Sequence, residues 1–279
     1  MDYNPHGIED QAITTALAKA GFIQPSSVIH PRLFVCSTAI PKRGKSHWAV
    51  HAPDPVAVIA FDNGTELVAK KARAKGRRIW LANFRLKKQE EYKNETDAKR
   101  AWKEDWKRFE TAIEQIVADK RFRTLVVDTG DAAWELRMLE YFGTNQPKMA
   151  KNERYSEWGE CNSGFRRIIM DAYDKRDDLN MIWIHKTKKE YGQNTKGEDS
   201  WTGKYERAGF KDMSFLADVN IEHYFDTESR EFGIRILDSR ENMTEVIGME
   251  LTGELCTFGE LALQVFRQHP EGGKEAFWK

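Results

Sequence analysis

Apolar runs that end in polar residues constrain the fold of this chain more than any other feature of its sequence. The runs "VAVIAFD" (56–62) and "TLVVD" (124–128) are almost unbroken, as expected for strands covered on both faces. The segments "RLFVCST" (32–38), "RRIWLANF" (77–84) and "LNMIWIHK" (179–186) have a similar composition. Helical segments lie between these runs. The pattern therefore predicts an α/β fold with a mostly parallel central sheet flanked by helices.

The helical segments are indicated by their period. Five apolar residues recur at steps of three and four between 91 and 120: Trp102, Trp106, Phe109, Ile113 and Ile116. We expect further helices at 7–20, 47–52, 132–143, 163–176 and 258–269. We expect antiparallel strands toward the C-terminus at 219–226, 231–240 and 244–251. The polar segments 144–160 and 192–213 have the composition of loops, and the second is expected to be a mobile surface segment.

Length and composition restrict the class of protein. A chain of 279 residues is better explained by one α/β domain, 31–279, with an N-terminal helical extension, 1–30, than by two full domains. Lys+Arg and Asp+Glu both number 44, which argues against a coat of positive charge but allows a local basic groove. The three cysteines are widely spaced and form no CxxC pair, as in a cytosolic protein. No apolar run approaches the roughly 20 residues of a membrane helix, so we expect a cytoplasmic protein without a membrane partner.

The segment "AIPKRGKS" (39–46), here called the phosphate loop, fills the pattern GxxxxGK[ST] with one departure. Gly44 lets the backbone approach a phosphate, Lys45 can reach the β- and γ-oxygens, and the Ser46 hydroxyl can hold Mg²⁺. The residues expected to bind a nucleotide are Ala39, Pro41, Lys42, Arg43, Gly44, Lys45, Ser46 and His47. Ala39 replaces the first glycine, which costs about 1 kcal/mol if the site demands a positive φ. The alternative is a basic surface turn that happens to contain Gly-Lys-Ser.

Two further strand ends carry carboxylates. Asp128 ends a strand and is the predicted partner of Ser46 in holding Mg²⁺. The alternative for Asp128 is a helix N-cap, but Asp131 fits that position better. Asp62 and Glu66 follow another strand, where a carboxylate can orient or deprotonate a water molecule. We expect Glu66 to act on the water and Asp62 to support the metal; the alternative is an Asp-Asn-Gly turn with Glu66 starting a helix.

His185 ends a fourth apolar strand, where a polar side chain can sense the nucleotide state; the alternative is a structural histidine. These motifs together resemble the RecA-type recombinase ATPases. They are most similar to the compact single-domain phage members known as single-strand annealing or RecA-like NTP-binding proteins. The segments that carry the resemblance are "AIPKRGKS", "VIAFDNGTE", "TLVVDTGD", "MIWIHKTKKEY" and "YERAGFKDMSFLADVNIEHYF", between residues 32 and 225.

The resemblance implies a RecA-like ATPase domain that uses ATP and Mg²⁺, assembles as a homo-oligomeric ring or filament, and couples ATP to single-stranded DNA. In a phage-encoded chain it would act in the host cytoplasm. By position, Lys45 and Ser46 match the family's phosphate-loop pair, and Asp128 its metal-associated acid. The turn 62–66 matches the region of its catalytic glutamate, and His185 its polar sensor. The catalytic residues implied are therefore Glu66, Asp62, Lys45 and His185.

A cationic track with aromatic platforms is the usual way to hold a single strand of DNA. The segment 186–211 combines Tyr191, Trp201 and Tyr205 with basic residues, and is the predicted DNA contact. Its basic residues are Lys186, Lys188, Lys189, Lys204, Arg207 and Lys211. The last three could instead reach a neighbouring subunit's γ-phosphate. The alternative to a DNA contact is that these basic residues form an ordinary charged surface exposed to solvent.

The expected function is ATP binding and hydrolysis by a protein that acts on single-stranded DNA in recombination, annealing or repair. A first alternative is a nucleotide-binding assembly or interaction protein with little turnover. A second is a small-molecule phosphotransferase, although no lid of closely spaced arginines is evident beyond "KKARAKGRR" (70–78). A packaging or unwinding motor is disfavoured by the short chain.

Overall fold

The computed structural model describes residues 32–147, 154–193, 199–267 and 278. The chain divides into two units, Met1–His30 and Pro31–Lys279, and every described residue belongs to the second. The helix expected at 7–20 lies outside the described residues. Among the described residues, no helix is both long and apolar enough to cross a membrane.

One sheet contains the nine strands of the described residues. Their bounds are Phe34–Ala39 (β1), Val56–Ala60 (β2), Ile79–Asn83 (β3), Thr124–Asp128 (β4), Asn180–Gln193 (β5), Asp199–Arg207 (β6), Val219–Asp226 (β7), Glu231–Ser239 (β8) and Glu250–Thr252 (β9). The order is β3-β2-β4-β5-β1-β7-β8-β9, with β6 paired to β5. Pairings from β3 to β7 are parallel, and β6, β8 and β9 pair antiparallel. The expected fold class is confirmed.

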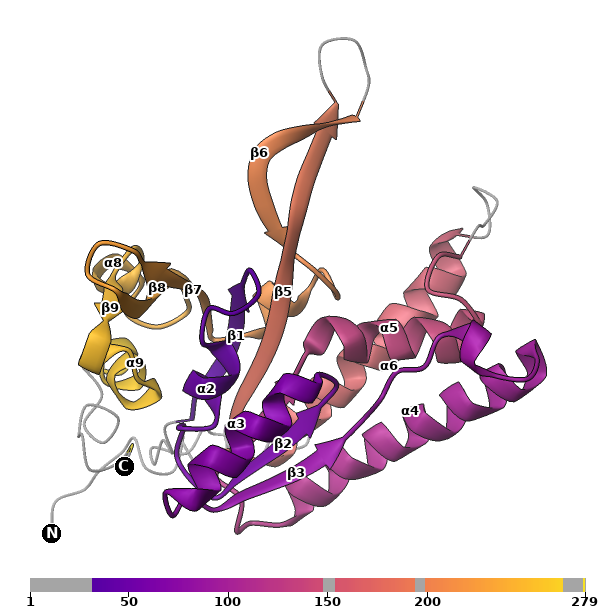
Figure 1. The fold of residues 1–279 in the computed structure, drawn as a ribbon, viewed down its shortest axis with the longest axis horizontal. Coiled ribbons are helices and arrows are strands. Elements are labelled where there is room, and N and C mark those ends of the chain that lie inside the picture. The colour runs from indigo at the N-terminus through magenta and orange to yellow at the C-terminus, as the bar shows by residue number, and fades with distance from the viewer. Residues whose placement is uncertain (1–31, 148–153, 194–198, 268–277, 279) are drawn as a thin grey trace, which may run out of the picture. The chain divides into compact units, whose positions relative to one another are not determined.

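Helices cover both faces of this sheet (Figure 1). Their bounds are Lys45–Ala49 (α2), Asn63–Ala74 (α3), Glu95–Ala118 (α4), Gly130–Phe142 (α5), Arg154–Lys175 (α6), Met213–Leu216 (α7), Met243–Val246 (α8) and Phe258–Val265 (α9), with short 3₁₀ turns at Gln89–Glu91 and Gly253–Leu255. One apolar core joins the sheet to α4, α5 and α6, and the other joins it to α2, α3 and α9. Successive side chains of a strand point to opposite faces, so Phe34 and Cys36 enter the first core and Val35 the second.

The helix α4 forms as its period predicts. Trp102, Trp106 and Phe109 are almost fully buried on the face that packs against the sheet. The Asn94 side chain accepts a hydrogen bond from the Asp97 backbone N–H at 2.8 Å and caps the first turn. The helix α5 ends at Phe142 and is capped by Gly143, whose φ of 69° lies in the left-handed region that favours glycine.

Three expected elements differ in the structure. The segment 192–213 is not a loop throughout, because β6 pairs with a long β5 and forms a hairpin. The described side chains 201–206 of β6 are exposed and mostly polar, so this strand lacks the apolar pattern by which strands are recognised. The helix α6 begins at Arg154, nine residues before the expected start, because Trp158 packs against Trp134 and Phe142. The strand expected at 244–251 is the short helix α8 followed by the three-residue β9.

Candidate functional site

The strand register brings together the carboxyl ends of the strands that carry the predicted nucleotide-site residues, and these ends form one edge of the sheet. Ala60 at the end of β2 is paired with Asp128 at the end of β4, and Asp128 lies opposite Ile184 of β5. On the other side of β5, Ala39 at the end of β1 is paired with Lys186. The carboxyl ends of three parallel strands therefore meet here, which is where ligands bind in open α/β sheets.

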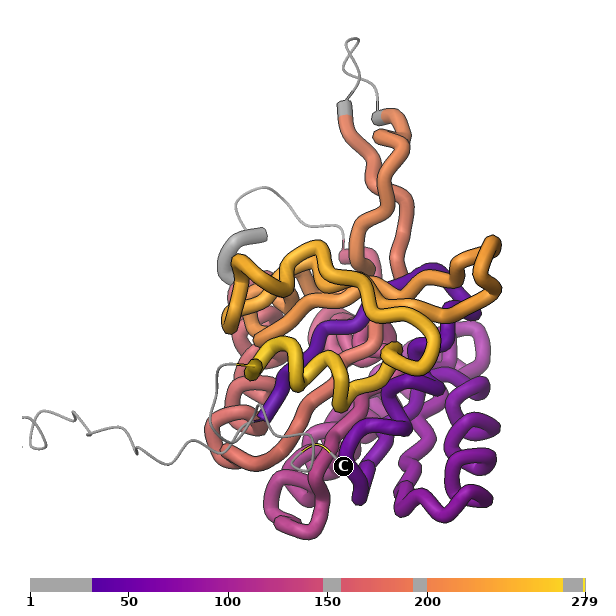
Figure 2. Tube along the Cα trace, turned by 90° about the vertical axis from the view of Figure 1, so that its left-hand side faces the viewer, coloured from indigo at the N-terminus to yellow at the C-terminus, as the bar shows by residue number. Residues whose placement is uncertain are grey.

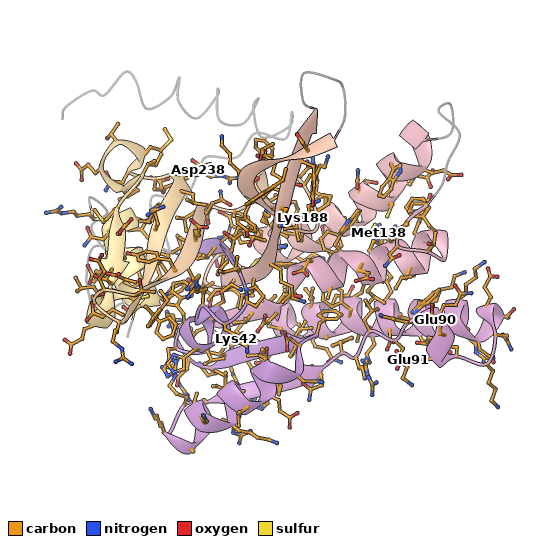
Figure 3. The ribbon with its side chains drawn as sticks, turned by 45° about the horizontal axis from the view of Figure 1, so that its top comes forward. Lys42, Glu90, Glu91, Met138, Lys188 and Asp238 are labelled. Carbon is orange, nitrogen blue, oxygen red and sulfur yellow. The ribbon has the colours of Figure 1, made fainter. Side chains whose placement is uncertain are left out.

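The phosphate loop connects β1 to the short helix α2 (Figure 3). Ala39 is the last residue of β1, is paired with Lys186 of β5, is 1% exposed, and does not have a positive φ. The cost expected for a side chain at this position therefore does not arise. The left-handed positions are instead Lys42, with a φ of 66°, and Gly44, with a φ of 81°. Because α2 has only five residues, an anion at this loop would depend more on backbone N–H groups and Lys45 than on a helix dipole.

Lys45 is buried beneath the loop, with only 8% of its surface exposed. Its Nζ donates hydrogen bonds to the backbone carbonyls of Ala39 at 3.0 Å and Ile40 at 3.2 Å. Burial lowers the pKa of the ammonium, while the charges of Asp128 and Asp131 oppose this change. Two backbone carbonyls of the phosphate loop therefore hold the Lys45 ammonium inside that loop.

Asp128 is the centre of a small group of oxygen atoms. Its carboxylate is 2% exposed, and one oxygen, Oδ2, accepts hydrogen bonds from Ser46 Oγ at 2.6 Å and Thr65 Oγ1 at 2.5 Å. Burial raises the pKa of Asp128, and the two hydroxyl donors offset part of that rise. The phosphate loop, the start of α3 and the end of β4 are therefore joined at this carboxylate.

Asp62 and Glu66 lie at the start of α3 but differ in their surroundings. Asp62 is the N-cap of the helix, and its Oδ1 accepts a hydrogen bond from the Gly64 N–H at 2.9 Å. Its charge contributes to the pKa values of both Asp128 and Lys45, so it belongs electrostatically to the site. Glu66 is in the first turn and forms an ion pair with Lys70 at 2.5 Å. The structure has the strand-ending turn and the helix start that were the alternative interpretation of this segment.

Asp131 does not have the expected capping role. The N-cap of α5 is Thr129, and Asp131 lies in the first turn. Its carboxylate accepts a hydrogen bond from the Lys186 backbone N–H at 3.2 Å and lies 3.8 Å from the Lys186 ammonium. Asp131 therefore links the segment after Asp128 to β5.

His185 is fully buried behind this edge rather than exposed on it. Its Nδ1 lies 3.1 Å from the Ala208 carbonyl oxygen, and burial lowers its pKa to about 3. The neutral ring therefore donates from Nδ1, which leaves Nε2 without a hydrogen-bond partner. A Cβ at Gly130 would meet Nε2 at 2.7 Å, and one at Gly209 would meet Nδ1 at 3.2 Å. His185 thus packs between the start of α5 and the segment that follows β6.

The predicted DNA residues lie on the β5–β6 hairpin or just after it. Figures 1 and 2 show the hairpin extending away from the rest of the sheet. Tyr191, Trp201 and Tyr205 are 61%, 49% and 54% exposed. The Lys189 ammonium lies 4.9 Å from the centre of the Trp201 ring, in the range of a cation–π contact. The hairpin thus exposes aromatic rings with a cation beside one of them.

The remaining basic residues of this region differ in how they are held. Lys188 is labelled in Figure 3 and forms an ion pair with Glu206 at 3.1 Å. The Arg207 guanidinium donates to the backbone carbonyls of Phe210 and Lys211, both at 2.7 Å, and is therefore held by its own segment. Lys204 and Lys211 have exposed side chains. Of the three residues expected to reach a neighbour, Arg207 is the least available.

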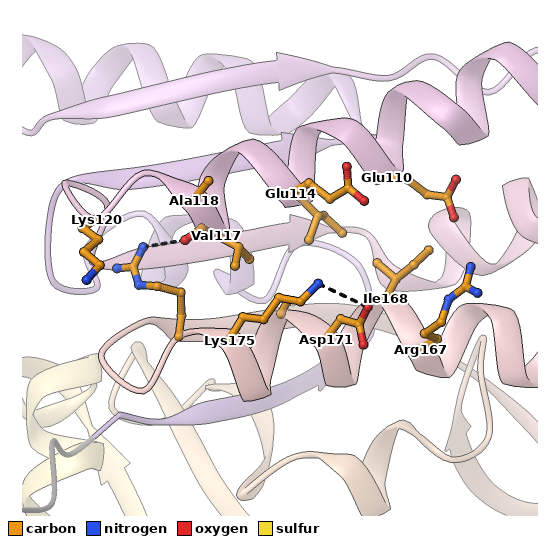
Figure 4. A pocket seen from close by; sticks show the side chains of 12 residues that line it. Glu110, Glu114, Val117, Ala118, Lys120, Arg167, Ile168, Asp171 and Lys175 are labelled. Atoms are coloured by element: carbon orange, nitrogen blue, oxygen red, sulfur yellow. Dashed lines mark hydrogen bonds and ion pairs between the residues drawn. The ribbon is translucent and has the colours of Figure 1, made fainter.

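A groove of about 540 Å³ lies between α4 and α6, and none of the predicted site residues line it (Figure 4). Ile113, Val117 and Ile168 form its apolar part. Lys175 and Asp171 on its rim are paired at 3.5 Å. The groove is therefore separate from the phosphate loop.

The residues at the sheet edge fit Mg²⁺ and a nucleotide. The carboxylate of Asp128 and the hydroxyls of Ser46 and Thr65 are hard oxygen donors, the ligand type that Mg²⁺ takes. Thr65 was not among the predicted site residues. Its only signal in the sequence is a hydroxyl that follows the Asp62-Asn63-Gly64 turn.

Comparison with known proteins identifies a family. A model described as an AAA domain matches residues 33–244, more than half of the chain. None of the curated proteins matches the chain. The crystal structure of the RadB recombinase is 10% identical, with 80% of this chain and 87% of that one covered and a TM-score of 0.45. A KaiC-like protein from the hyperthermophilic archaeon Pyrococcus horikoshii OT3 is 12% identical, with 80% and 85% covered and a TM-score of 0.45.

Proposed function

The chain belongs to the AAA domain family, and we propose that it binds ATP at the phosphate loop, hydrolyses it and acts on single-stranded DNA. One observation carries the proposal of a nucleotide site. Ser46 of the phosphate loop and Thr65 of α3 both bond to the buried Asp128, at the edge where the strands end. A basic surface turn is not expected to donate a hydrogen bond to a buried carboxylate, as Ser46 does to Asp128.

Each residue has a separate task in this proposal. The backbone N–H groups of the loop and the Lys45 ammonium hold the phosphates. Asp128, Ser46 and Thr65 supply oxygen ligands for Mg²⁺, which neutralises phosphate charge when it is bound. Asp62 caps the N-terminus of α3 beside this group of oxygen atoms, where its carboxylate can orient a water molecule. Glu66 can take that task only if it leaves Lys70.

Replacement of Lys45 by alanine tests the site. The variant should lose ATP binding in titration calorimetry, because Lys45 is the buried cation of the loop. Lys103→Ala removes an exposed cation from α4 and serves as the matched control. Circular dichroism of both variants separates loss of binding from loss of the fold. An unchanged ATP affinity in a folded Lys45→Ala protein refutes the assigned site.

The DNA part of the proposal is supported by the hairpin. Its exposed rings can stack with bases, and Lys186, Lys189 and Lys204 can pair with phosphates. His185 packs against both the segment after β6 and Gly130, two residues from Asp128. That contact is a physical link between the nucleotide site and the hairpin. We place the activity in recombination, annealing or repair of a phage type.

We also propose that the chain assembles into a ring or filament, with Lys204 or Lys211 facing the neighbouring subunit's nucleotide. Mass measurement of particles with ATP, with a single-stranded oligonucleotide, and with both together tests this. Larger particles that need both ligands are expected. A monomer under all three conditions contradicts the assembly but leaves the nucleotide site standing.

A second candidate is a nucleotide-binding protein with little turnover. The ion pair of Glu66 with Lys70 favours it, because the expected catalytic carboxylate is held by a cation on its own helix. Steady-state phosphate release with and without single-stranded DNA separates the two candidates. ATP binding without phosphate release in either condition supports the second.

A further inference from the structure

Phe232 lies against the phosphate loop and Phe225 packs on Phe232; neither bonds to Asp128, Ser46 or Thr65. The ring of Phe232 packs on Gly44: a Cβ built at that glycine would lie 3.2 Å from the ring carbon Cδ1. Phe232 is nevertheless 47% exposed. Phe225 is its cross-strand partner on β7, with the ring centres 5.0 Å apart. A half-exposed aromatic ring therefore borders the loop at the glycine before Lys45.

The β7–β8 hairpin, which carries these two residues, continues past the pairing of β7 with β1. The strand β7 pairs with β1 only from Val219 to Glu222. The next four residues, 223–226, continue in pairing with β8 alone. Because β1 ends at Ala39, where the phosphate loop begins, this extension of β7 runs beside the loop.

The aromatic pair and Asp128 lie on opposite sides of β1. In the sheet, β7 is the neighbour of β1 on one side, while β5 and then β4 with Asp128 follow on the other. The terminal phosphates of a nucleotide belong with Lys45 and with the oxygens of Ser46 and Asp128. The nucleoside is the other end of the same molecule and would lie farther from Asp128, and the β7–β8 hairpin is what borders the loop on that side.

The geometry points to Phe232 as the platform on which the base of a bound nucleoside triphosphate stacks, with Phe225 holding its ring in place. This inference rests on the proposed function and extends it to the base. Every nucleobase has a flat π face, and stacking on an aromatic side chain changes an affinity by about tenfold. Phe232 offers no hydrogen bond, so this contact does not distinguish one base from another.

Titration calorimetry with two probes tests the platform. The full chain and its variants are titrated with ATP and with inorganic tripolyphosphate, which has the phosphates but no base, each with Mg²⁺. Phe232→Ala should bind ATP about tenfold more weakly and tripolyphosphate within twofold of the wild-type value. Phe232→Tyr keeps the ring and should restore the ATP affinity. Phe215→Ala, which removes a ring that is 78% exposed on α7, should leave both affinities unchanged.

The two probes also separate this inference from the proposed function. Wild-type protein that binds neither ligand refutes the nucleotide site, and the platform with it. Wild-type protein that binds ATP, beside a Phe232→Ala variant of equal affinity, refutes only the platform. An equal loss for ATP and tripolyphosphate in Phe232→Ala also overturns it, because the ring would then support the loop rather than the base.

Discussion

Replacement of Thr65 by valine removes one hydroxyl from the Asp128 group and changes little else. Thr65 is 1% exposed, and its Oγ1 donates to Asp128 Oδ2 at 2.5 Å. Valine has nearly the same shape, so the variant leaves no cavity. Asp128 keeps its hydrogen bond from Ser46 but loses the other. The effect on stability therefore reports on the hydrogen bond alone.

The magnitude follows from the charge of the acceptor. A hydrogen bond to a charged group contributes about 1.5–3 kcal/mol, against about 0.5–1.5 kcal/mol for a neutral pair. We expect Thr65→Val to lower the free energy of unfolding by about 1.5–3 kcal/mol, which corresponds to a melting temperature about 3–12 °C lower. Thr38→Val is the matched control, because Thr38 is also buried and its Oγ1 donates to the neutral Ile221 carbonyl at 3.0 Å. It should cost about 0.5–1.5 kcal/mol.

Urea denaturation at pH 8 without nucleotide measures both variants, alone and combined with Asp128→Asn. In the Asp128→Asn background the cost of Thr65→Val should fall to that of a neutral pair, while the cost of Thr38→Val should not change. If Thr65→Val costs no more than Thr38→Val, or costs the same with and without the carboxylate, the assigned interaction is wrong.

Three further outcomes are expected. Asp128→Asn should stabilise the nucleotide-free protein and abolish Mg²⁺-dependent ATP binding. Burial raises the pKa of the Asp128 carboxyl, so its charged form destabilises the folded wild-type protein. The urea midpoint of the variant should therefore exceed that of the wild type by more as the pH rises above 3.8. Burial lowers the pKa of His223 from 6.5 to about 3, so only the unfolded chain takes up this proton as the pH falls below 6.5. His223→Phe should therefore reduce the pH dependence of the unfolding free energy by about 1.2 kcal/mol between pH 6 and 5, measured by urea denaturation. Trp201→Ala should weaken single-stranded DNA binding about tenfold in fluorescence anisotropy, whereas Trp80→Ala, which removes an exposed ring from β3, should not.

Local pattern was sufficient for the elements that build both cores. Burial of apolar side chains explains the continuous apolar runs of β2 and β4 and the helical period of α4. Pattern failed at β6 and at the part of β5 that pairs with it, because described side chains such as those at 188–189 and 201–206 are exposed and mostly polar. It also placed the start of α6 too late, because the helix is extended by Trp158, a partly buried residue that packs against two rings from another helix.

The candidate site shows the same division. Local motifs were enough to select Lys45, Ser46 and Asp128. The first two belong to the pattern of a phosphate loop, and the third ends a short apolar strand. The sequence alone could not assign the hydroxyl of Thr65 to the carboxylate at 128, which is 63 residues away. The sequence also could not show that the two carboxylates differ in their surroundings. The charge of Asp62 raises the pKa of Lys45, whereas Glu66 forms an ion pair with Lys70.

By itself, the sequence determined that buried parallel strands end in polar residues and that a phosphate loop follows the first of them, because burial and backbone sterics act over a few residues. Only the tertiary structure decided which of these ends meet, that Ala39 stays in its strand, and that Phe232 of a distant hairpin lies on Gly44. Those contacts depend on strand order and register, which the packing of the whole sheet sets.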